Sequence, residues 1–329
     1  MYTQVHAARN GYVTAVVSSR FSLQYTRENN PISQPTTNRH ANLFANLSSH
    51  GLFSRMPQEP LVRVISIGAL SAHPLWGERG NVRTGHSTTT LITMGKNKIL
   101  VDPGLPPTVL AARLAERANL SPTDITHVFL TSFHPDTRRA LHAFESAAWI
   151  ISEAEREAVG VALATRLREV IERGAESSIG RDVDLEGEHE AQLEIDDNPE
   201  LHANRAQGEQ DLDDPVAAYS RERAILEREI SLLRRCVAAP DEIVPKVDLF
   251  PLPGVTPGLS GLLIEGSRFT TLICGDAVPT AEHLERGQVL TIATDVEQAR
   301  ESFREAVEIA DVMVLGRDNI IMNALKGPF

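Results

Sequence analysis

The stretch THVFLTSFHPDT, residues 126–137, is the most informative segment of this chain for its fold. Its apolar run at 128–130 predicts a buried strand, and the polar residues after that run predict a loop at the carboxyl end of the strand. The loop carries His134 and Asp136, two residues apart. Because open α/β sheets bind ligands at the carboxyl ends of their strands, we expect a functional site in this loop.

The charge of the chain is unevenly distributed. The 329 residues have a formal net charge of -12, and only 5% of them are aromatic. Residues 182–214 contain 13 acidic side chains and one basic side chain, Arg205, so the rest of the chain is close to neutral. An acidic balance with no basic stripe argues against nucleic acid as a partner.

The two cysteines, Cys236 and Cys274, lie far apart in the sequence. They predict neither a disulfide framework nor a cysteine-based zinc site, which is typical of a reducing compartment. No apolar run reaches the roughly 20 residues that a membrane span requires. We therefore expect a cytoplasmic protein with no membrane segment.

Residues 1–58 differ in composition from the rest of the chain. Residues 1–55 contain a single acid, Glu28, together with five arginines and many Ser, Asn and Thr residues. This composition fits a disordered extension, translated sequence upstream of a true start at Met56, or an Arg-rich transit peptide. We expect residues 1–58 to lie outside the folded domain.

From residue 61 onward, strand and helix patterns alternate. Alternating or β-branched runs predict strands at 61–68, 87–93, 98–101, 126–130, 149–151, 247–252, 261–265, 270–274 and 312–315. Helical spacing predicts helices at 105–119, 152–174, 216–237 and 296–310. Strand hairpins interleaved with helices predict an α/β fold with two sheets and outer helices.

The segment 155–238 is predicted to be a helical insertion with an acidic connection. Ser152 and Glu155 have the spacing of a capping box at the start of the first helix. The expected apolar stripe of that helix is Val161, Leu163, Leu167, Val170 and Ile171, and that of the second is Ile225, Leu226, Ile230, Leu232 and Leu233. Such an arm suits a lid, a homodimer contact or a solvated excursion, and its acidic connection has the composition of a disordered loop.

Five stretches resemble landmarks of the metallo-β-lactamase superfamily and occur in the right order. They are ILVDPG at 99–104, the opening stretch at 126–137, LPGVTPG at 252–258, ICGDAV at 273–278 and ADVMVLGRDN at 310–319. The opening stretch resembles the family signature H-x-H-x-D-H with its flanking histidines replaced. The resemblance implies a metallo-β-lactamase-like αββα sandwich over residues 59–325, interrupted by the insertion.

The resemblance also implies a set of site residues. In the intact family, histidines and aspartates hold two zinc ions, which lower the pKa of a bridging water and make it a hydroxide nucleophile. Transferred position by position, this chain keeps three of the ligands: His134, Asp136 and Asp276. The four other ligand positions are occupied by Ser132, Thr137, Val255 and Arg317.

Arg317 is the most informative replacement. Zinc sites use three or four protein ligands, so the residual set predicts no intact dinuclear zinc centre. A guanidinium brings fixed positive charge and several donors, and we expect it to pair with Asp136 or Asp276 in place of metal. Asp318, the next residue, is a further candidate for the pocket.

Two other residues are expected to have structural roles. Asp102 lies in the V-D-P-G turn, where the family resemblance implies a carboxylate that bonds turn amides or supports the ligand shell. His127 lies within the predicted strand of the opening stretch and is expected to be packed or hydrogen-bonded.

Three functions remain open on the sequence. The first is a non-catalytic scaffold, or a pocket for an unknown small-molecule ligand, without a cofactor. The second is a hydrolase of an ester, thioester or phosphodiester, with Asp136 as a catalytic carboxylate and a single Zn, Mn or Fe ion held by the residual ligands and by His86 or His73. The third, an RNA-processing nuclease, is disfavoured by the acidic insertion and the lack of a basic stripe.

Overall fold

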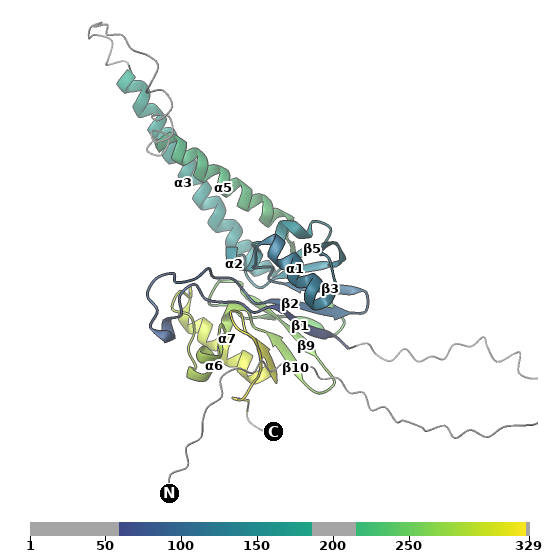
Figure 1. The fold of residues 1–329 in the computed structure, drawn as a ribbon. Helices are drawn as coiled ribbons and strands as arrows, with labels where there is room; N and C mark the ends of the chain where they lie inside the picture. Colours follow the sequence, from purple (N-terminus) through teal and green to yellow (C-terminus); the bar gives the residue numbers. More distant parts are fainter. Residues whose placement is uncertain (1–58, 186–214, 327–329) are drawn as a thin grey trace, which may run out of the picture. The chain divides into compact units, whose positions relative to one another are not determined.

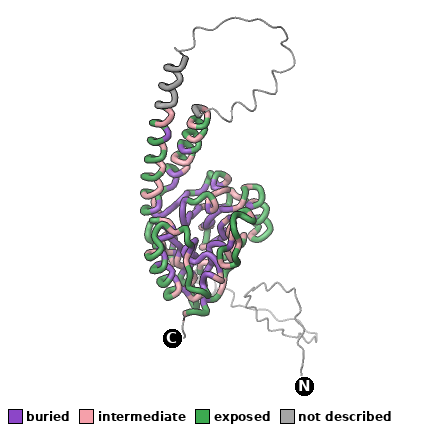
Figure 2. Tube along the Cα trace, turned by 90° about the vertical axis from the view of Figure 1, so that its left-hand side faces the viewer, coloured by how far each residue is buried: buried purple, intermediate pink, exposed green. Residues whose placement is uncertain are grey.

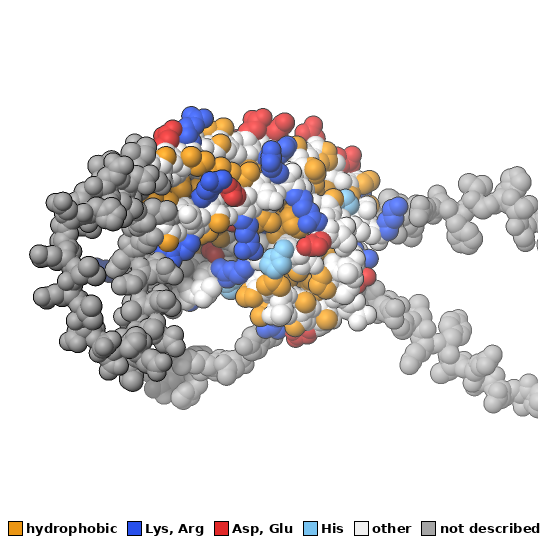
Figure 3. Space-filling view, turned by 90° about the horizontal axis from the view of Figure 1, so that it is seen from above, with side chains coloured by type: hydrophobic (Ala, Val, Ile, Leu, Met, Phe, Trp, Pro, Cys, Tyr) orange, Lys and Arg blue, Asp and Glu red, His pale blue; other side chains and the backbone are white. Residues whose placement is uncertain are grey.

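The structure is a computed structural model that describes residues 59–185 and 215–326. The predicted extension at 1–58 and the acidic connection at 186–214 lie outside the described residues. The described residues form two six-stranded sheets with helices outside them (Figure 1). The surface seen in Figure 3 mixes hydrophobic side chains with side chains of both charges, in keeping with the near-neutral composition outside the acidic stretch.

The first sheet contains the signature strand. Its order is β1-β2-β3-β4-β5-β6, with bounds β1 (Leu61–Ser66), β2 (Thr89–Met94), β3 (Asn97–Val101), β4 (His127–Leu130), β5 (Ala148–Ile151) and β6 (Val237–Ala238). Strands β1 to β3 pair antiparallel, and β3 to β6 run parallel. Because parallel strands end at the same edge of a sheet, the loops after β3, β4 and β5 meet there.

The second sheet has the order β12-β11-β10-β9-β8-β7. Its strands are β7 (Glu242–Val244), β8 (Val247–Pro251), β9 (Ser260–Glu265), β10 (Thr270–Ile273), β11 (Val312–Val314) and β12 (Ile320–Met322). The pair β10 and β11 is parallel, so the loops that carry Asp276 and Arg317 leave the sheet side by side. The strands β6, β7 and β12 were not predicted, because two or three residues are too few to show a strand period. The helix predicted at 216–237 ends at Arg235, and Val237 belongs to β6.

The helices are α1 (Pro107–Ala118), α2 (Pro135–Arg138), α3 (Glu153–Leu185), α5 (Pro215–Arg235), α6 (Ala281–Arg286) and α7 (Val296–Ile309), with single 3-10 turns at η1 (Pro74–Trp76), η2 (Pro122–Asp124), η3 (Leu141–Phe144) and η4 (Gly275–Ala277). The predicted helix at 152–174 is present and continues to Leu185. No helix within the two described ranges is both long and apolar enough to cross a bilayer.

Three clusters of buried apolar side chains fill the spaces between the layers. Strand β4 shows the arrangement, since Val128 and Leu130 pack with α1 on the outer face while Phe129 packs between the two sheets. The third cluster lies between the second sheet and the helices α6 and α7, and it includes Leu272 and Phe303. The order helix, sheet, sheet, helix is the αββα sandwich that the landmarks implied.

Helices α3 and α5 lie side by side as a hairpin that leaves the first sheet (Figures 1 and 2). The predicted apolar stripes were wrong in three places, because Val161 is 69% exposed, Ile171 46% and Ile225 62%. These three side chains face solvent, whereas Val170 and Leu226 are buried. The hairpin therefore exposes apolar side chains that the sequence pattern had assigned to its interior.

Candidate functional site

The signature loop closes on itself at the end of β4. His134 caps the short helix α2, and its Nδ1 accepts a hydrogen bond from the Asp136 amide at 3.2 Å. The buried Thr137 hydroxyl lies 2.8 Å from the carbonyl oxygens of Ser132 and His134. At the position of the family's last signature histidine, this chain thus has a hydroxyl that bonds its own loop.

Arg317 joins the two retained aspartates. Its Nε and Nη2 donate to the two carboxylate oxygens of Asp276, each at 2.7 Å, and its Nη1 donates to Asp136 at 2.8 Å. The second oxygen of Asp136 accepts from Arg139 at 3.1 Å. The side chains of Arg317 and Asp276 are only 5% and 11% exposed. We call these four residues the aspartate–arginine chain.

The charges within the aspartate–arginine chain stabilise one another. Burial by itself raises the pKa of Asp276, but the charge and hydrogen bonds of Arg317 outweigh burial and hold that pKa below its ordinary value. Burial lowers the pKa of Arg317, yet the carboxylates of Asp276 and Asp136 raise it further above its ordinary value. Both partners of the buried pair are therefore ionised at neutral pH.

Asp102 is hydrogen-bonded to the start of the signature loop. Its carboxylate accepts from the Thr131 amide at 2.9 Å and from the Thr131 hydroxyl at 2.7 Å. Burial raises the pKa of Asp102 to about 7, although the two hydrogen bonds from Thr131 oppose that rise. Asp102 thus bonds the first residue after β4, in the structural role that the family resemblance implied.

Two glycines allow the site loops to meet. A Cβ at Gly104 would lie 2.1 Å from the carbonyl oxygen of Asp136, and a Cβ at Gly316 would lie 2.3 Å from that of Gly275. Real Cβ atoms do not come so close to backbone oxygens. The loops after β3, β4, β10 and β11 can therefore converge only with glycine at these positions.

Glu155 is the residue whose role the sequence did not show. Half of the predicted capping box exists, because the Glu155 amide donates to the Ser152 hydroxyl at 3.2 Å. The other half was wrong: the buried Glu155 carboxylate accepts from the Phe133 amide at 2.9 Å, from the Thr256 hydroxyl at 2.7 Å and from the Gly258 amide at 3.1 Å. It meets these donors because the 252–258 turn and the signature loop both pack against the first turn of α3.

The peptide groups of Phe133 are held by Glu155 of α3 directly and by Glu229 of α5 through Arg138 of α2. Its amide donates to Glu155 on α3, and its carbonyl accepts from Arg138 Nε at 2.9 Å. The Arg138 guanidinium lies 4.1 Å from the centre of the Phe133 ring and forms an ion pair with Glu229 on α5. The helical hairpin and α2 thus together hold the residue between Ser132 and His134.

The two histidines proposed as replacement ligands are engaged elsewhere. His86 Nε2 lies 3.2 Å from the carbonyl oxygen of Ile67. His73 stacks on Trp76 with ring centroids 4.1 Å apart, and its Nε2 lies 3.2 Å from the Thr280 hydroxyl. Neither ring has a polar contact with Asp136 or Asp276 within the described part of the chain.

The other residues singled out in the sequence lie in different surroundings. His134 lies beside the site, with its Nδ1 3.9 Å from an oxygen of Asp136. Val255 is buried in the apolar cluster beneath α6 and α7, and the Asp318 carboxylate accepts from the Ala281 amide at 3.2 Å. His127 is half-buried and lies 2.9 Å from the Thr126 hydroxyl, in agreement with a packed histidine.

These residues do not fit a metal ion. In residues 59–185 and 215–326, no group of three or more His, Cys, Asp or Glu side chains is placed to hold one. Both oxygens of Asp276 and one of Asp136 already accept from Arg317, so a cation would have to displace charge-assisted hydrogen bonds. The carboxylates of Asp136 and Asp276 are therefore part of an ion-pair network with Arg317.

Comparison with known proteins agrees with the landmarks at 99–104 and 126–137. The model of the metallo-beta-lactamase superfamily matches residues 82–207. This part of the chain is therefore similar to the metallo-β-lactamase superfamily. No curated protein sequence matches the chain significantly.

Several solved structures are similar to this chain in part. A Thermotoga maritima protein assigned to the metallo-beta-lactamases is 16% identical, with 80% of this chain and 99% of that chain covered and a TM-score of 0.49. AidC, a dizinc quorum-quenching lactonase, is 16% identical over 67% of each chain with a TM-score of 0.42. A quorum-quenching N-acyl homoserine lactone lactonase is 17% identical over 76% of this chain and 86% of its own, also with a TM-score of 0.42.

Proposed function

We propose that this protein is a non-catalytic member of the metallo-β-lactamase fold that acts as a scaffold or binding domain. The main support for the proposal is the contact set of Arg317, which donates two hydrogen bonds to Asp276 and a third to Asp136. On this proposal, the aspartate–arginine chain has replaced the metal centre, and a cytoplasmic location is compatible with the two buried, unpaired thiols.

The surroundings of Arg317 support this proposal. Val255 cannot coordinate a cation, and the Thr137 hydroxyl bonds its own loop. In this chain, each of the two ion positions of the intact family therefore lacks some of its protein ligands. Hydroxyl groups such as that of Ser132 do not compensate, since zinc in proteins is held by thiolate, imidazole and carboxylate.

Electrostatics explain how the site is stable without a cation. Two carboxylates close together in a buried site repel each other, and one of them would take up a proton unless a positive charge lay between them. Arg317 provides that charge from a permanently ionised group. Removing one partner of such a buried pair costs about 3–5 kcal/mol, so expulsion of the guanidinium by a metal ion would be opposed by a term of that order.

A rearranged mononuclear hydrolase is the competing function. The closeness of His134 to Asp136 favours it, because an imidazole and a carboxylate could serve as two ligands. The positions of His73 and His86 weigh against it, since each ring is bonded to groups on other elements. A third and fourth ligand would have to come from elsewhere after Arg317 moved away.

Metal analysis of the purified full chain tests the proposal. We expect no stoichiometric zinc, manganese or iron after purification without added metal, and none after incubation with each metal followed by desalting. The positive control is a variant that restores the family's ligand set, with Ser132→His, Thr137→His, Val255→His and Arg317→His. Stoichiometric tightly bound metal in the wild-type chain would refute the non-catalytic proposal and support the mononuclear hydrolase.

A further inference from the structure

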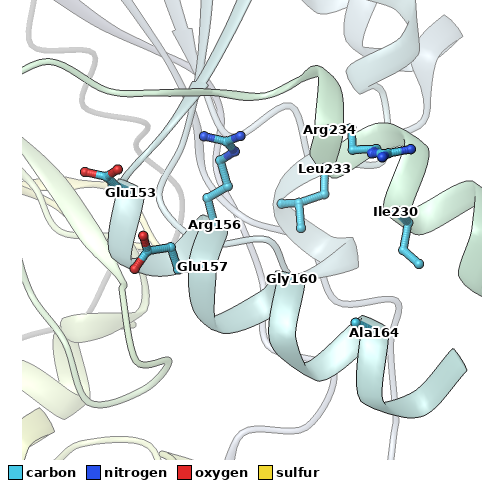
Figure 4. Close-up of a pocket in the computed structure, with 8 residues that line it drawn as sticks. All are labelled: Glu153, Arg156, Glu157, Gly160, Ala164, Ile230, Leu233 and Arg234. Atoms are coloured by element: carbon cyan, nitrogen blue, oxygen red, sulfur yellow. The ribbon is translucent and has the colours of Figure 1, made fainter. Parts of the chain in front are cut away.

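A cavity of about 350 Å³ lies at the base of the helical hairpin, between α3 and α5 (Figure 4). Its apolar lining comes from both helices: Gly160, Ala164, Ile230 and Leu233. Its charged lining also comes from both helices: Glu153, Arg156, Glu157 and Arg234. The small residues Gly160 and Ala164, one turn apart on α3, leave room between the helices.

The charges of this cavity are not paired with one another. Farther along the same hairpin, Arg166 is paired with Glu222, and on α5 Arg223 is paired with Glu227. Among the described residues, in contrast, none of the four charged side chains of the cavity takes part in an ion pair. Two cations and two anions are therefore available to an outside partner.

The acidic side of the cavity continues into a second hollow of about 540 Å³. This hollow shares Glu153 and Glu157 with the cavity and adds Asp241. Its other wall is formed by prolines of strand β8 and of the 252–258 turn. The face thus has a basic end near Arg234 and an acidic end near Asp241.

An exposed apolar side chain lies beside the cavity. Val161 comes four residues after Glu157, so the two side chains occupy the same face of α3. Val161 is among the most exposed large hydrophobic residues of the described chain. We call Glu153, Arg156, Glu157, Val161, Ile230 and Arg234 the hairpin-base face.

We propose that the hairpin-base face is a two-fold interface with a second copy of this chain. A small anion bound to Arg156 and Arg234 would be repelled by the two glutamates. A cation bound to the glutamates would likewise be repelled by the two arginines. A second copy related by a two-fold axis can pair with both the arginines and the glutamates, because the basic end of each copy then faces the acidic end of the other. The exposed Val161 of each copy finds apolar surface in the cavity of its partner.

Charge reversal of the full chain tests this interface by sedimentation velocity over a range of concentrations. We expect the wild-type chain to form dimers. One variant carries Arg156→Glu with Arg234→Glu, and the other carries Glu153→Arg with Glu157→Arg. Each should raise the dimer dissociation constant at least tenfold, because like charges then face each other across the axis.

An equimolar mixture of the two reversed variants should regain association, detected as a mixed dimer by native mass spectrometry. The matched control is Arg79→Glu with Arg304→Glu, which makes the same change in net charge at exposed positions outside this face and should leave the dimer unchanged. Far-UV circular dichroism checks that every variant is folded. A monomeric wild-type chain, a dimer insensitive to both reversals, or a mixture without mixed dimers would each overturn the proposal.

Discussion

Substitution of Arg317 by methionine removes the buried guanidinium that contacts Asp276, while keeping a side chain of similar length. Asp276 then remains in a site where its own side chain is only 11% exposed, with no opposite charge beside it. An uncompensated buried charge of this kind destabilises a fold by about 3–5 kcal/mol. For a domain of this size the melting temperature should fall by about 2–4 °C for each kcal/mol, or about 10 °C in all.

Urea denaturation of three variants separates the ion pair from simple loss of packing. Arg317→Met and Asp276→Asn should each destabilise the chain, and the double variant should cost less than the two single losses together by about 2 kcal/mol or more. The double variant is the control, because it leaves no unpaired charge at the site. A loss below about 0.5 kcal/mol in Arg317→Met, or strict additivity, would refute the buried pair.

The same comparison has a defined pH dependence. Arg317 holds the pKa of Asp276 below its ordinary value of 3.8, so the pair stabilises the folded chain above that pH. This stabilisation is lost as the pH falls through the lower pKa of the folded state. The difference in unfolding free energy between the wild-type chain and Arg317→Met should therefore be full at neutral pH and shrink in acid.

Three further predictions concern the loops around the site. Because burial raises the pKa of Asp102 from 3.8 to about 7, the wild-type chain should lose stability, on the order of a few kcal/mol, as the pH rises between those values. Urea denaturation at several pH values should show no such loss in Asp102→Asn, and equal slopes would contradict the raised pKa. Glu155→Ala leaves the Phe133 amide without its acceptor and should cost about 3 kcal/mol, with faster hydrogen exchange at that amide, whereas Glu155→Gln should cost less. Gly258→Ala places a Cβ 1.9 Å from the Glu155 amide nitrogen and should lower the melting temperature, and an unchanged melting temperature would contradict this close packing.

The sequence predicted the fold well because its landmarks are local. Strands and helices of ordinary length show their period within a few residues, and the order of the landmark loops implied which loops would meet. The contact between Arg317 and the two aspartates could be expected on the same basis, since the loops after parallel strands lie at one edge.

Features that depend on tertiary packing could not be predicted in this way. A glutamate three residues after Ser152 looks like a capping box, and nothing in the sequence shows that donors from two distant loops surround Glu155. The apolar residues of α3 likewise do not reveal which side faces α5, so Val161 was assigned to the wrong face. The contact of Arg139 with Asp136 was missed because neighbouring arginines in a loop carry no directional signal.

The contacts of Phe133 couple the helical hairpin to the signature loop. The amide of Phe133 bonds a residue 22 positions away, and its carbonyl is reached through an arginine whose partner Glu229 lies 91 positions from that arginine. A chain shortened by excising residues 155–238 would lose Glu155, which accepts from the Phe133 amide, and Glu229, which holds Arg138 by an ion pair. The inserted arm and the signature loop should therefore unfold as one cooperative unit, and transplanting either of them alone into another sandwich would not reproduce its conformation.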